Sequence, residues 1–197
     1  MSRTKETNHV RQQPPSRLSY SGFTLIEVVV AVLILSLGVL GVAGLQIIST
    51  RSNFEGLQRS QATQLANDTI DRMRANPERL DSYSGTNLGN GTMTTEPAGC
   101  TSDMAEAVCL TARADRDRWE LEQSADRSDA LITPRICITN NVGGAGLGNV
   151  RVSVAWRGIS RWEAAGIAPT DPCGQAIIGM DYLKQVTMTT YITPLNP

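Results

Sequence analysis

A run of apolar residues from Phe23 to Thr50 contains a single ionisable side chain, that of Glu27. The run is rich in Val, Leu, Ile, Gly and Ala, contains no proline, and ends at Arg51. About 20 apolar residues span the hydrocarbon core of a bilayer as an α-helix, and a helix satisfies its own backbone hydrogen bonds there. The pattern therefore predicts a transmembrane helix over residues 23–50.

Glu27 is the unusual residue of this segment, because it lies inside the apolar run near its start. An acidic side chain within a bilayer costs on the order of 2–3 kcal/mol or more unless it finds a partner. Two opposite charges that are both nearly dry each remove part of the other's desolvation penalty when they pair. We therefore expect Glu27 to require a cation.

The residues Gly22-Phe23-Thr24-Leu25-Ile26-Glu27 resemble the processing site of type IV prepilins. The resemblance implies that a prepilin peptidase cuts between Gly22 and Phe23 on the cytoplasmic side and N-methylates Phe23. Glu27 would then be the fifth residue of the mature chain, where this family carries a glutamate. Its implied partner is the terminal amine of a neighbouring subunit, so that an assembly salt bridge sets the register between helices.

Two other interpretations of the apolar run stay open. A secretory signal would be cut after its apolar region, near small residues such as Val42-Ala43-Gly44, but this run is long and follows a polar segment. An uncleaved single-pass anchor would explain the hydrophobicity but not the hexapeptide around Gly22. We favour the prepilin interpretation, because only this one accounts for both features.

Residues 1–22 form the expected leader, which would be cleaved from the working protein. Its net charge is +3, and subtracting that from the −1 of the whole chain leaves −4 for the mature chain. Basic residues beside an apolar run predict a cytoplasmic N-terminus. The soluble part is then expected in the periplasm, anchored in the inner membrane, and later on the pilus at the cell surface. A negative mature chain argues against nucleic acid as a partner.

Helical periodicity continues past the membrane segment through residues 51–76, where it becomes amphipathic. Asn76-Pro77 predicts the end of this helix, because the residue before a proline disfavours helical backbone. Within the membrane segment, Gly38, Gly41 and Gly44 recur at every third position. Small residues allow close approach of membrane helices, so these are candidate helix-packing residues, although glycine tolerated in a lipid-exposed helix explains them equally well. The residues expected on the buried face of the amphipathic half are Leu57, Ala62, Leu65, Ala66, Ile70 and Met73.

Residues 77–197 predict a soluble α+β domain. Residues 82–91 have loop composition, residues 92–95 could pair briefly as a strand, and residues 110–124 predict a short surface helix with a solvated charged face. Alternating patterns predict strands over residues 135–139, 150–157 and 186–192. A small antiparallel sheet with one apolar face needs a cover. The expected fold is therefore pilin-like, with a long N-terminal helix, transmembrane in its first half and amphipathic in its second, packed on that sheet.

The four cysteines, Cys100, Cys109, Cys137 and Cys173, all follow the membrane segment. Outside the cytoplasm such cysteines are expected to form disulfides, and three pairings are possible. We favour Cys100–Cys109 and Cys137–Cys173, because each pair closes a loop next to an expected element. The only histidine, His9, lies in the leader and no Cys-x-x-Cys pair is present, so we expect neither a metal site nor a cofactor.

Residues 27–46 and 152–156 are also similar to the PilV family of minor pilins. This resemblance implies a subunit that joins other minor pilins at the filament tip, primes assembly of the major pilin, and supports adhesion and twitching motility without enzymatic activity. The minor pseudopilins of type II secretion share the same N-terminal pattern and are the main alternative.

Two functions of other classes remain as alternatives. A membrane-anchored hydrolase without histidine would need a Ser-Lys pair, and Lys184 is the only lysine after the leader. A membrane-tethered adhesin acting as a monomer would not need cleavage at Gly22. No catalytic residue is predicted. Arg157, Arg161, Trp156 and Trp162 form a small basic and aromatic cluster, which we interpret as packing at a strand end.

Overall fold

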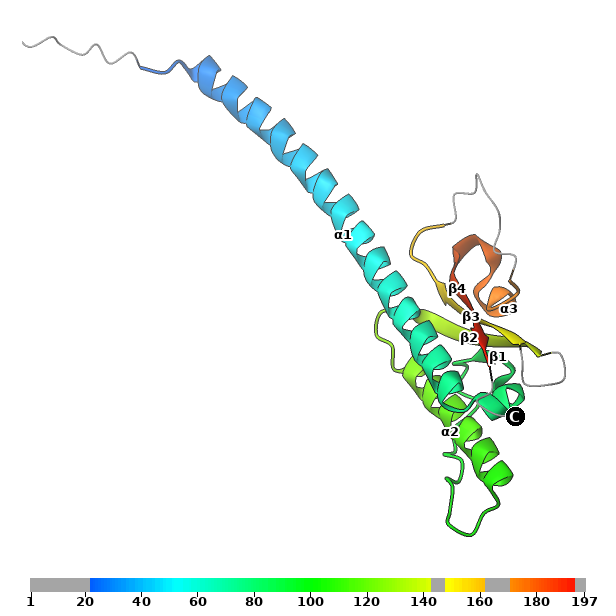
Figure 1. Cartoon of the computed structure of the whole chain (residues 1–197). Helices are drawn as coiled ribbons and strands as arrows, with labels where there is room; N and C mark the ends of the chain where they lie inside the picture. The colour runs from blue at the N-terminus through cyan, green and yellow to red at the C-terminus, as the bar shows by residue number, and fades with distance from the viewer. Residues whose placement is uncertain (1–21, 143–147, 162–170, 194–197) are drawn as a thin grey trace, which may run out of the picture. The chain divides into compact units, whose positions relative to one another are not determined.

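A computed structural model describes residues 22–142, 148–161 and 171–193 (Figure 1). Residues 1–21 of the expected leader, residues 143–147, residues 162–170 with Trp162, and residues 194–197 with Pro194 lie outside the described residues. The chain divides into two compact units, Met1–Ile47 and Ile48–Pro197, called unit 1 and unit 2 below. Helix α1, Leu25–Ala75, contributes to both.

Unit 1 contains the apolar part of α1, and no other described part of the protein covers its side chains. The large apolar residues from Val28 to Ile47 are all exposed. Among the described residues, α1 is the one helix that is long and apolar enough to cross a membrane. An apolar helix without a protein partner needs a bilayer or other subunits around it.

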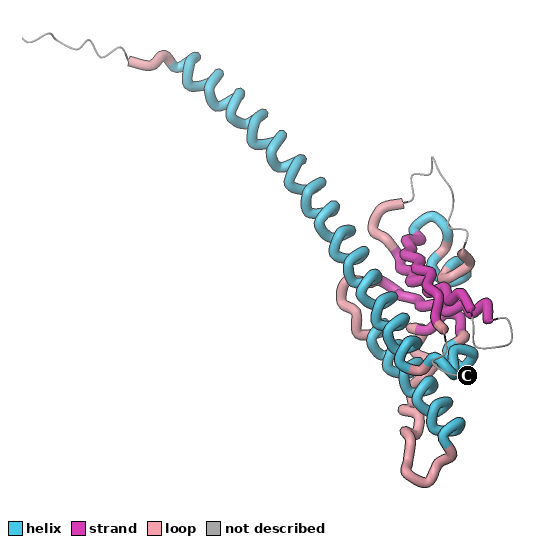
Figure 2. Tube along the Cα trace, viewed as in Figure 1, coloured by secondary structure: helices cyan, strands magenta, loops and turns pink. Residues whose placement is uncertain are grey.

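Unit 2 is built on a four-stranded antiparallel sheet (Figure 2). The strand order follows the chain, β1-β2-β3-β4, so that each connection is made between neighbours. The strands are β1 (Gly85–Leu88), β2 (Ile132–Val142), β3 (Gly148–Arg157) and β4 (Leu183–Ile192). The remaining elements are η1 (Pro77–Tyr83), α2 (Glu106–Asp126), α3 (Gln175–Ile178) and η2 (Met180–Tyr182).

The main core lies between one face of the sheet and the two helices α1 and α2. Strand β3 lies between β2 and β4 and supplies the centre of this face. Successive side chains of a strand point to opposite sides, so every second residue of β3 points into this core. The buried residues of this core include Ala62, Ala66, Ile70 and Met73 of α1, Leu121 and Ala125 of α2, and Val150, Val152, Val154 and Trp156 of β3. This confirms the pilin-like α+β architecture expected from the sequence.

A second, smaller core lies on the opposite face of the sheet. Cys137, Ala155 and Leu183 on the sheet pack with Cys173 and Ile178 from the segment between β3 and β4. Gly174 precedes α3 at a φ of 73°, and a Cβ there would meet Ala155 at 2.9 Å. Glycine at this position therefore lets the segment fold closely over the sheet.

Three local expectations were wrong. The brief strand is β1 at Gly85–Leu88 instead of residues 92–95, because β1 pairs with Ile136 and Ile138 of the long strand β2. Helix α2 is longer than expected and is partly buried, with Leu121 in the core. On α1 the inner position is Gln58, 1% exposed, whereas Leu57 is 49% exposed.

Candidate functional site

The hexapeptide expected to be the processing site lies at the start of α1. Gly22, Phe23 and Thr24 precede the helix, and Glu27 falls in its first turn. The carbonyl of Thr24 accepts the backbone amides of Glu27 at 3.1 Å and Val28 at 3.3 Å, which begins the helical hydrogen-bond ladder. Phe23 is 83% exposed. The peptide bond after Gly22 thus lies outside regular structure, where an enzyme can reach it.

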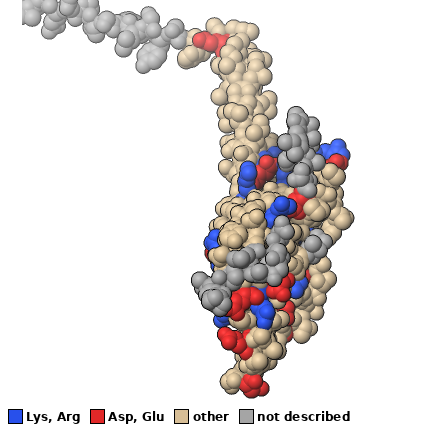
Figure 3. Space-filling view, turned by 45° about the vertical axis from the view of Figure 1, so that its right-hand side comes forward, with Lys and Arg blue, Asp and Glu red and all other residues tan. Residues whose placement is uncertain are grey.

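Among the residues that the structure describes, Glu27 has no cationic neighbour. Within the described residues no ion pair involves it, and the first basic residue after it in the sequence is Arg51. Figure 3 shows the apolar stretch as an uninterrupted tan surface, with acidic atoms only near its start. A carboxylate at the start of a helix is favoured by the helix dipole, but within a bilayer it still needs a counter-charge.

Gly38, Gly41 and Gly44 lie on the exposed apolar part of α1. No atom lies within 4 Å of the position that a Cβ would take at any of the three. The chain itself therefore imposes no steric demand for glycine at these positions. Their role in helix packing stays a prediction.

The four cysteines form two disulfides in unit 2, Cys100–Cys109 and Cys137–Cys173. These are the pairs favoured from the sequence. Cys100 is exposed and its disulfide closes the loop before α2, whereas Cys137 and Cys173 are both buried. The second disulfide ties the segment after β3 to strand β2 across a sequence separation of 36.

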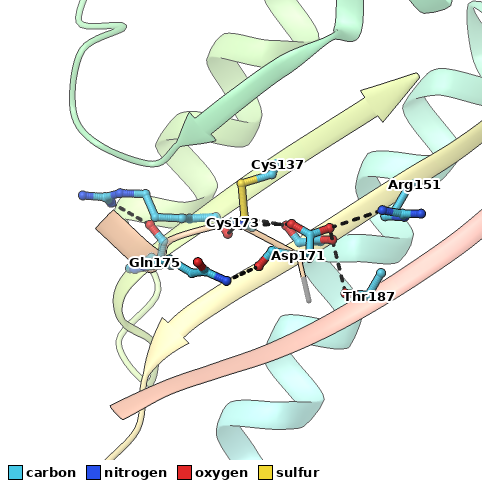
Figure 4. The surroundings of a disulfide bond; sticks show 9 residues. Cys137, Arg151, Asp171, Cys173, Gln175 and Thr187 are labelled. Atoms are coloured by element: carbon cyan, nitrogen blue, oxygen red, sulfur yellow. Dashed lines mark hydrogen bonds and ion pairs between the residues drawn. A yellow bond between two sulfur atoms is a disulfide. The ribbon is translucent and has the colours of Figure 1, made fainter. Parts of the chain in front are cut away.

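Asp171 organises the surroundings of the buried disulfide (Figure 4). Its carboxylate accepts hydrogen bonds from the backbone amide of Cys173 at 2.9 Å and the hydroxyl of Ser153 at 2.7 Å. Arg151 lies 4.0 Å from the same carboxylate. The turn that carries Cys173 is thus held to β3 by polar contacts and to β2 by the disulfide.

Gln58 joins α1 to the sheet from a fully buried position. Its side-chain nitrogen donates to the carbonyl of Ala130 at 2.9 Å, and its oxygen accepts from the indole of Trp156 at 3.2 Å. Both polar ends of the amide are therefore satisfied, as a buried amide requires. Sequence periodicity missed Gln58, although counting back four residues from Ala62 reaches it.

An ionic cluster fastens α1 to α2. Arg72 donates to Asp68 at 3.1 Å, Asp117 at 3.3 Å and Glu120 at 2.6 Å. Its hydrogen bond is the main reason that the pKa of Glu120 lies below its ordinary value. Burial, followed by a hydrogen bond to Asp117, raises the pKa of Tyr83. Arg72 of α1 therefore faces α2, and its side chain is only 24% exposed.

Glu122 corrects the expectation that the charged residues of α2 are solvated. It is fully buried and accepts the backbone amides of Gly89 at 3.0 Å and Thr92 at 2.9 Å. A buried carboxylate is tolerated when it satisfies donors that would otherwise be unpaired. Glu122 thus holds the loop after β1 against α2. No local sequence pattern predicts this structural role.

The basic and aromatic cluster is arranged differently from the expected one. Trp156 turns into the core towards Gln58, and the guanidinium groups of Arg157 and Arg161 lie over the ring of Tyr182 instead. In the described residues no group of acidic, histidine or cysteine side chains could hold a metal ion.

Comparison with known families gives two matches that adjoin each other in the sequence. Residues 17–43 match the prokaryotic N-terminal methylation motif, and residues 44–119 match the family described as type IV pilin Tt1218-like. No curated protein and no solved structure gave a match. The methylation motif includes Gly22, Phe23 and Glu27, and the second match begins in the apolar helix and extends through most of α2. Pilins are structural subunits that are processed by a prepilin peptidase and assemble with other pilins, and this chain is a type IV prepilin.

Proposed function

We propose that this chain is a minor pilin of a type IV pilus, close to the PilV family. Residues 1–22 form a cytoplasmic leader that the prepilin peptidase removes after Gly22, and Phe23 is then N-methylated. Residues 23–50 hold the subunit in the inner membrane, residues 51–76 continue into the periplasm, and residues 77–197 complete the soluble domain. With other minor pilins the subunit forms the tip complex that primes the major pilin and supports adhesion and twitching motility.

The observation that carries this proposal is an apolar helix surface that no described residue covers, with one acid at its start that forms no ion pair with a described residue. The side chains of residues 28–47 would be unstable in water, and Glu27 lacks a cation within the described residues. The bilayer covers the apolar surface while the subunit is in the membrane, and a bundle of like helices covers it after assembly. The new amine on Phe23 of a neighbouring subunit supplies the charge for Glu27.

Mass spectrometry of the N-terminus tests the proposal, using membrane fractions and sheared filaments. A chain that begins at methylated Phe23 in both fractions is the expected result. A chain that begins at residue 1 or 2 would contradict processing and leave a simple anchored domain. A chain that begins after Ala43 would indicate a secreted protein without a membrane helix.

A second measurement separates a pilus subunit from a type II pseudopilin, the main alternative. Deleting the gene should abolish twitching and reduce surface pili while secretion of exported enzymes continues. The opposite pattern, with lost secretion and normal pili, would assign the protein to type II secretion.

A further inference from the structure

A basic surface lies in unit 2 beside the first turns of α1 in that unit. Ile48, the last large apolar residue of the run, belongs to unit 2, and residues 52–59 follow it by one to three helical turns. A cavity of about 470 Å³ is lined both by this stretch of α1 and by Trp156, Lys184 and Gln185. The adjoining ends of β3 and β4 therefore lie beside residues 52–59 of α1. We call Arg157, Ile159, Arg161, Met180 and Tyr182 the basic end.

Two arginines of the basic end share one aromatic ring. The guanidinium carbon of Arg157 lies 5.2 Å from the centroid of Tyr182, and that of Arg161 lies 5.8 Å from it. Asp181 pairs with Arg161 at 2.9 Å, whereas no described acidic side chain forms an ion pair with Arg157. Two cations held together repel each other, and an anionic partner would relieve that repulsion.

Backbone contacts fix this arrangement. The amide of Gly158 donates to the carbonyl of Tyr182 at 2.8 Å, which joins the segments that carry the two arginines and the ring. A Cβ at Gly158 would lie 2.7 Å from the side chain of Lys184. Glycine at position 158 therefore permits the close approach of the Lys184 side chain. The backbone segments that carry Arg157 and Arg161 are thus fixed in position beside Tyr182.

Apolar side chains lie beside these charges. Ile159 is 48% exposed and Met180 is 53% exposed, and each is within two residues of the bond between Gly158 and Tyr182. Further basic residues, Arg51 and Arg59 on α1 and Lys184 on β4, add to the charge, against Glu55 and Asp181. In the face drawn in Figure 3, basic and acidic side chains both occur at the end of unit 2 beside the apolar stretch.

We propose that the basic end docks on the anionic surface of the bilayer in which α1 is anchored. Arginine binds phosphate groups through paired N–H donors, and Ile159 and Met180 would insert at the level of the headgroups. Docking would hold unit 2 against the membrane until assembly withdraws the subunit. The inference rests on the proposed membrane anchor but not on cleavage at Gly22 or on a place in the pilus.

Hydrogen–deuterium exchange of the full chain in lipid nanodiscs tests this docking. One preparation contains phosphatidylcholine alone, and the other also contains phosphatidylglycerol. Backbone amides of residues 156–161 and 177–184 are expected to exchange more slowly in the anionic lipid, and the difference should fade at high salt because salt screens the attraction. Equal exchange in the two lipids would overturn the proposal.

Matched variants identify the residues responsible. R157S/R161S removes two exposed arginines of the basic end, and R74S/R113S removes two exposed arginines near the other end of unit 2. Each basic residue near an anionic surface contributes a factor of about 5, so the first variant should weaken docking roughly 30-fold. The second variant should retain the slowed exchange, and an equal loss in both would overturn the assignment to this surface.

Hydrogen exchange of the backbone amides of residues 25–48 distinguishes a failure of the docking proposal from a failure of the proposed membrane anchor. If these amides are protected in both lipids while the basic end exchanges equally in both, docking is wrong and the anchor stands. If they exchange freely in both, the membrane anchor itself is wrong, and docking falls with it.

Discussion

The indole nitrogen of Trp156 on β3 donates a hydrogen bond of 3.2 Å to the side-chain oxygen of Gln58 on α1, although 98 positions separate them in the sequence. The same glutamine donates to the carbonyl of Ala130 at 2.9 Å. These two bonds join α1 to β3 and to the segment just before β2. The contact therefore fixes the part of α1 that belongs to unit 2 to the rest of that unit.

Replacing Gln58 by leucine should destabilise unit 2 by roughly 2–4 kcal/mol, because the indole N–H and the Ala130 carbonyl would both remain buried without partners. Urea unfolding of the full chain in detergent, followed by tryptophan fluorescence, measures the loss. Gln64→Leu is the control, because Gln64 is an exposed residue of the same helix. Equal stability of the two variants would show that the buried hydrogen bonds contribute nothing.

The ion pairs between α1 and α2 predict a loss of stability in acid. The hydrogen bond from Arg72 lowers the pKa of Glu120 in the folded protein, so the unfolded chain binds the proton more tightly. The contribution of this hydrogen bond to the free energy of unfolding is therefore fully present above the ordinary glutamate pKa, near pH 4.5. It disappears as the pH falls through the lower pKa that Glu120 has in the folded protein.

Glu120→Gln should accordingly lower the unfolding midpoint at pH 7 and flatten its dependence on pH between 5 and 3. Thermal unfolding followed by circular dichroism at a series of pH values gives both quantities. Glu78→Gln, at an exposed glutamate of η1, serves as the control and should leave the acid limb unchanged. A Glu120→Gln protein with the same acid limb as the wild type would contradict this account.

The two disulfides should differ in both stability and accessibility. In the chain-entropy model a longer closed loop restricts the unfolded state more, which gives about 4 kcal/mol for Cys137–Cys173 and about 2.5 kcal/mol for Cys100–Cys109. The Cys100–Cys109 pair includes an exposed cysteine and should be reduced first. Titration with dithiothreitol, alkylation and peptide mapping test the order. Reduction of Cys137–Cys173 at the lower concentration would contradict it.

Glu27 should matter for assembly and not for membrane insertion. Glu27→Gln removes the charge but keeps the shape, so the chain should still enter the membrane and be cut, yet its share in sheared filaments should fall at least tenfold. Immunoblotting of membrane and filament fractions measures the ratio. Ser36→Ala, which changes another polar residue of the apolar helix, is the control and should leave the ratio unchanged.

If the Glu27→Gln protein enters filaments to the same extent as the wild type, the proposed salt bridge is wrong. Such a result would leave the rest of the prepilin assignment intact, because that rests on the methylation motif and the pilin match.

Features encoded by neighbouring residues could be predicted from the sequence. The apolar run around Glu27 determined the membrane-type helix. The alternation from Val150 to Trp156 determined the strand, although its other face is buried too, at Ser153 and Ala155. Helix and strand periodicities are local properties, since each depends on residues a few positions apart. The family could likewise be recognised, because its motif occupies one short segment.

Only the tertiary structure decided which polar residues are buried. Glu122 reads as one more charge on a solvated helix, and it is buried because the amides of Gly89 and Thr92 arrive from a loop about thirty residues away. Gln58 lies inside because Trp156 and Ala130 meet it there. Burial of a polar group depends on the partners that satisfy it, and distant strands and loops supply those partners only once the chain has folded.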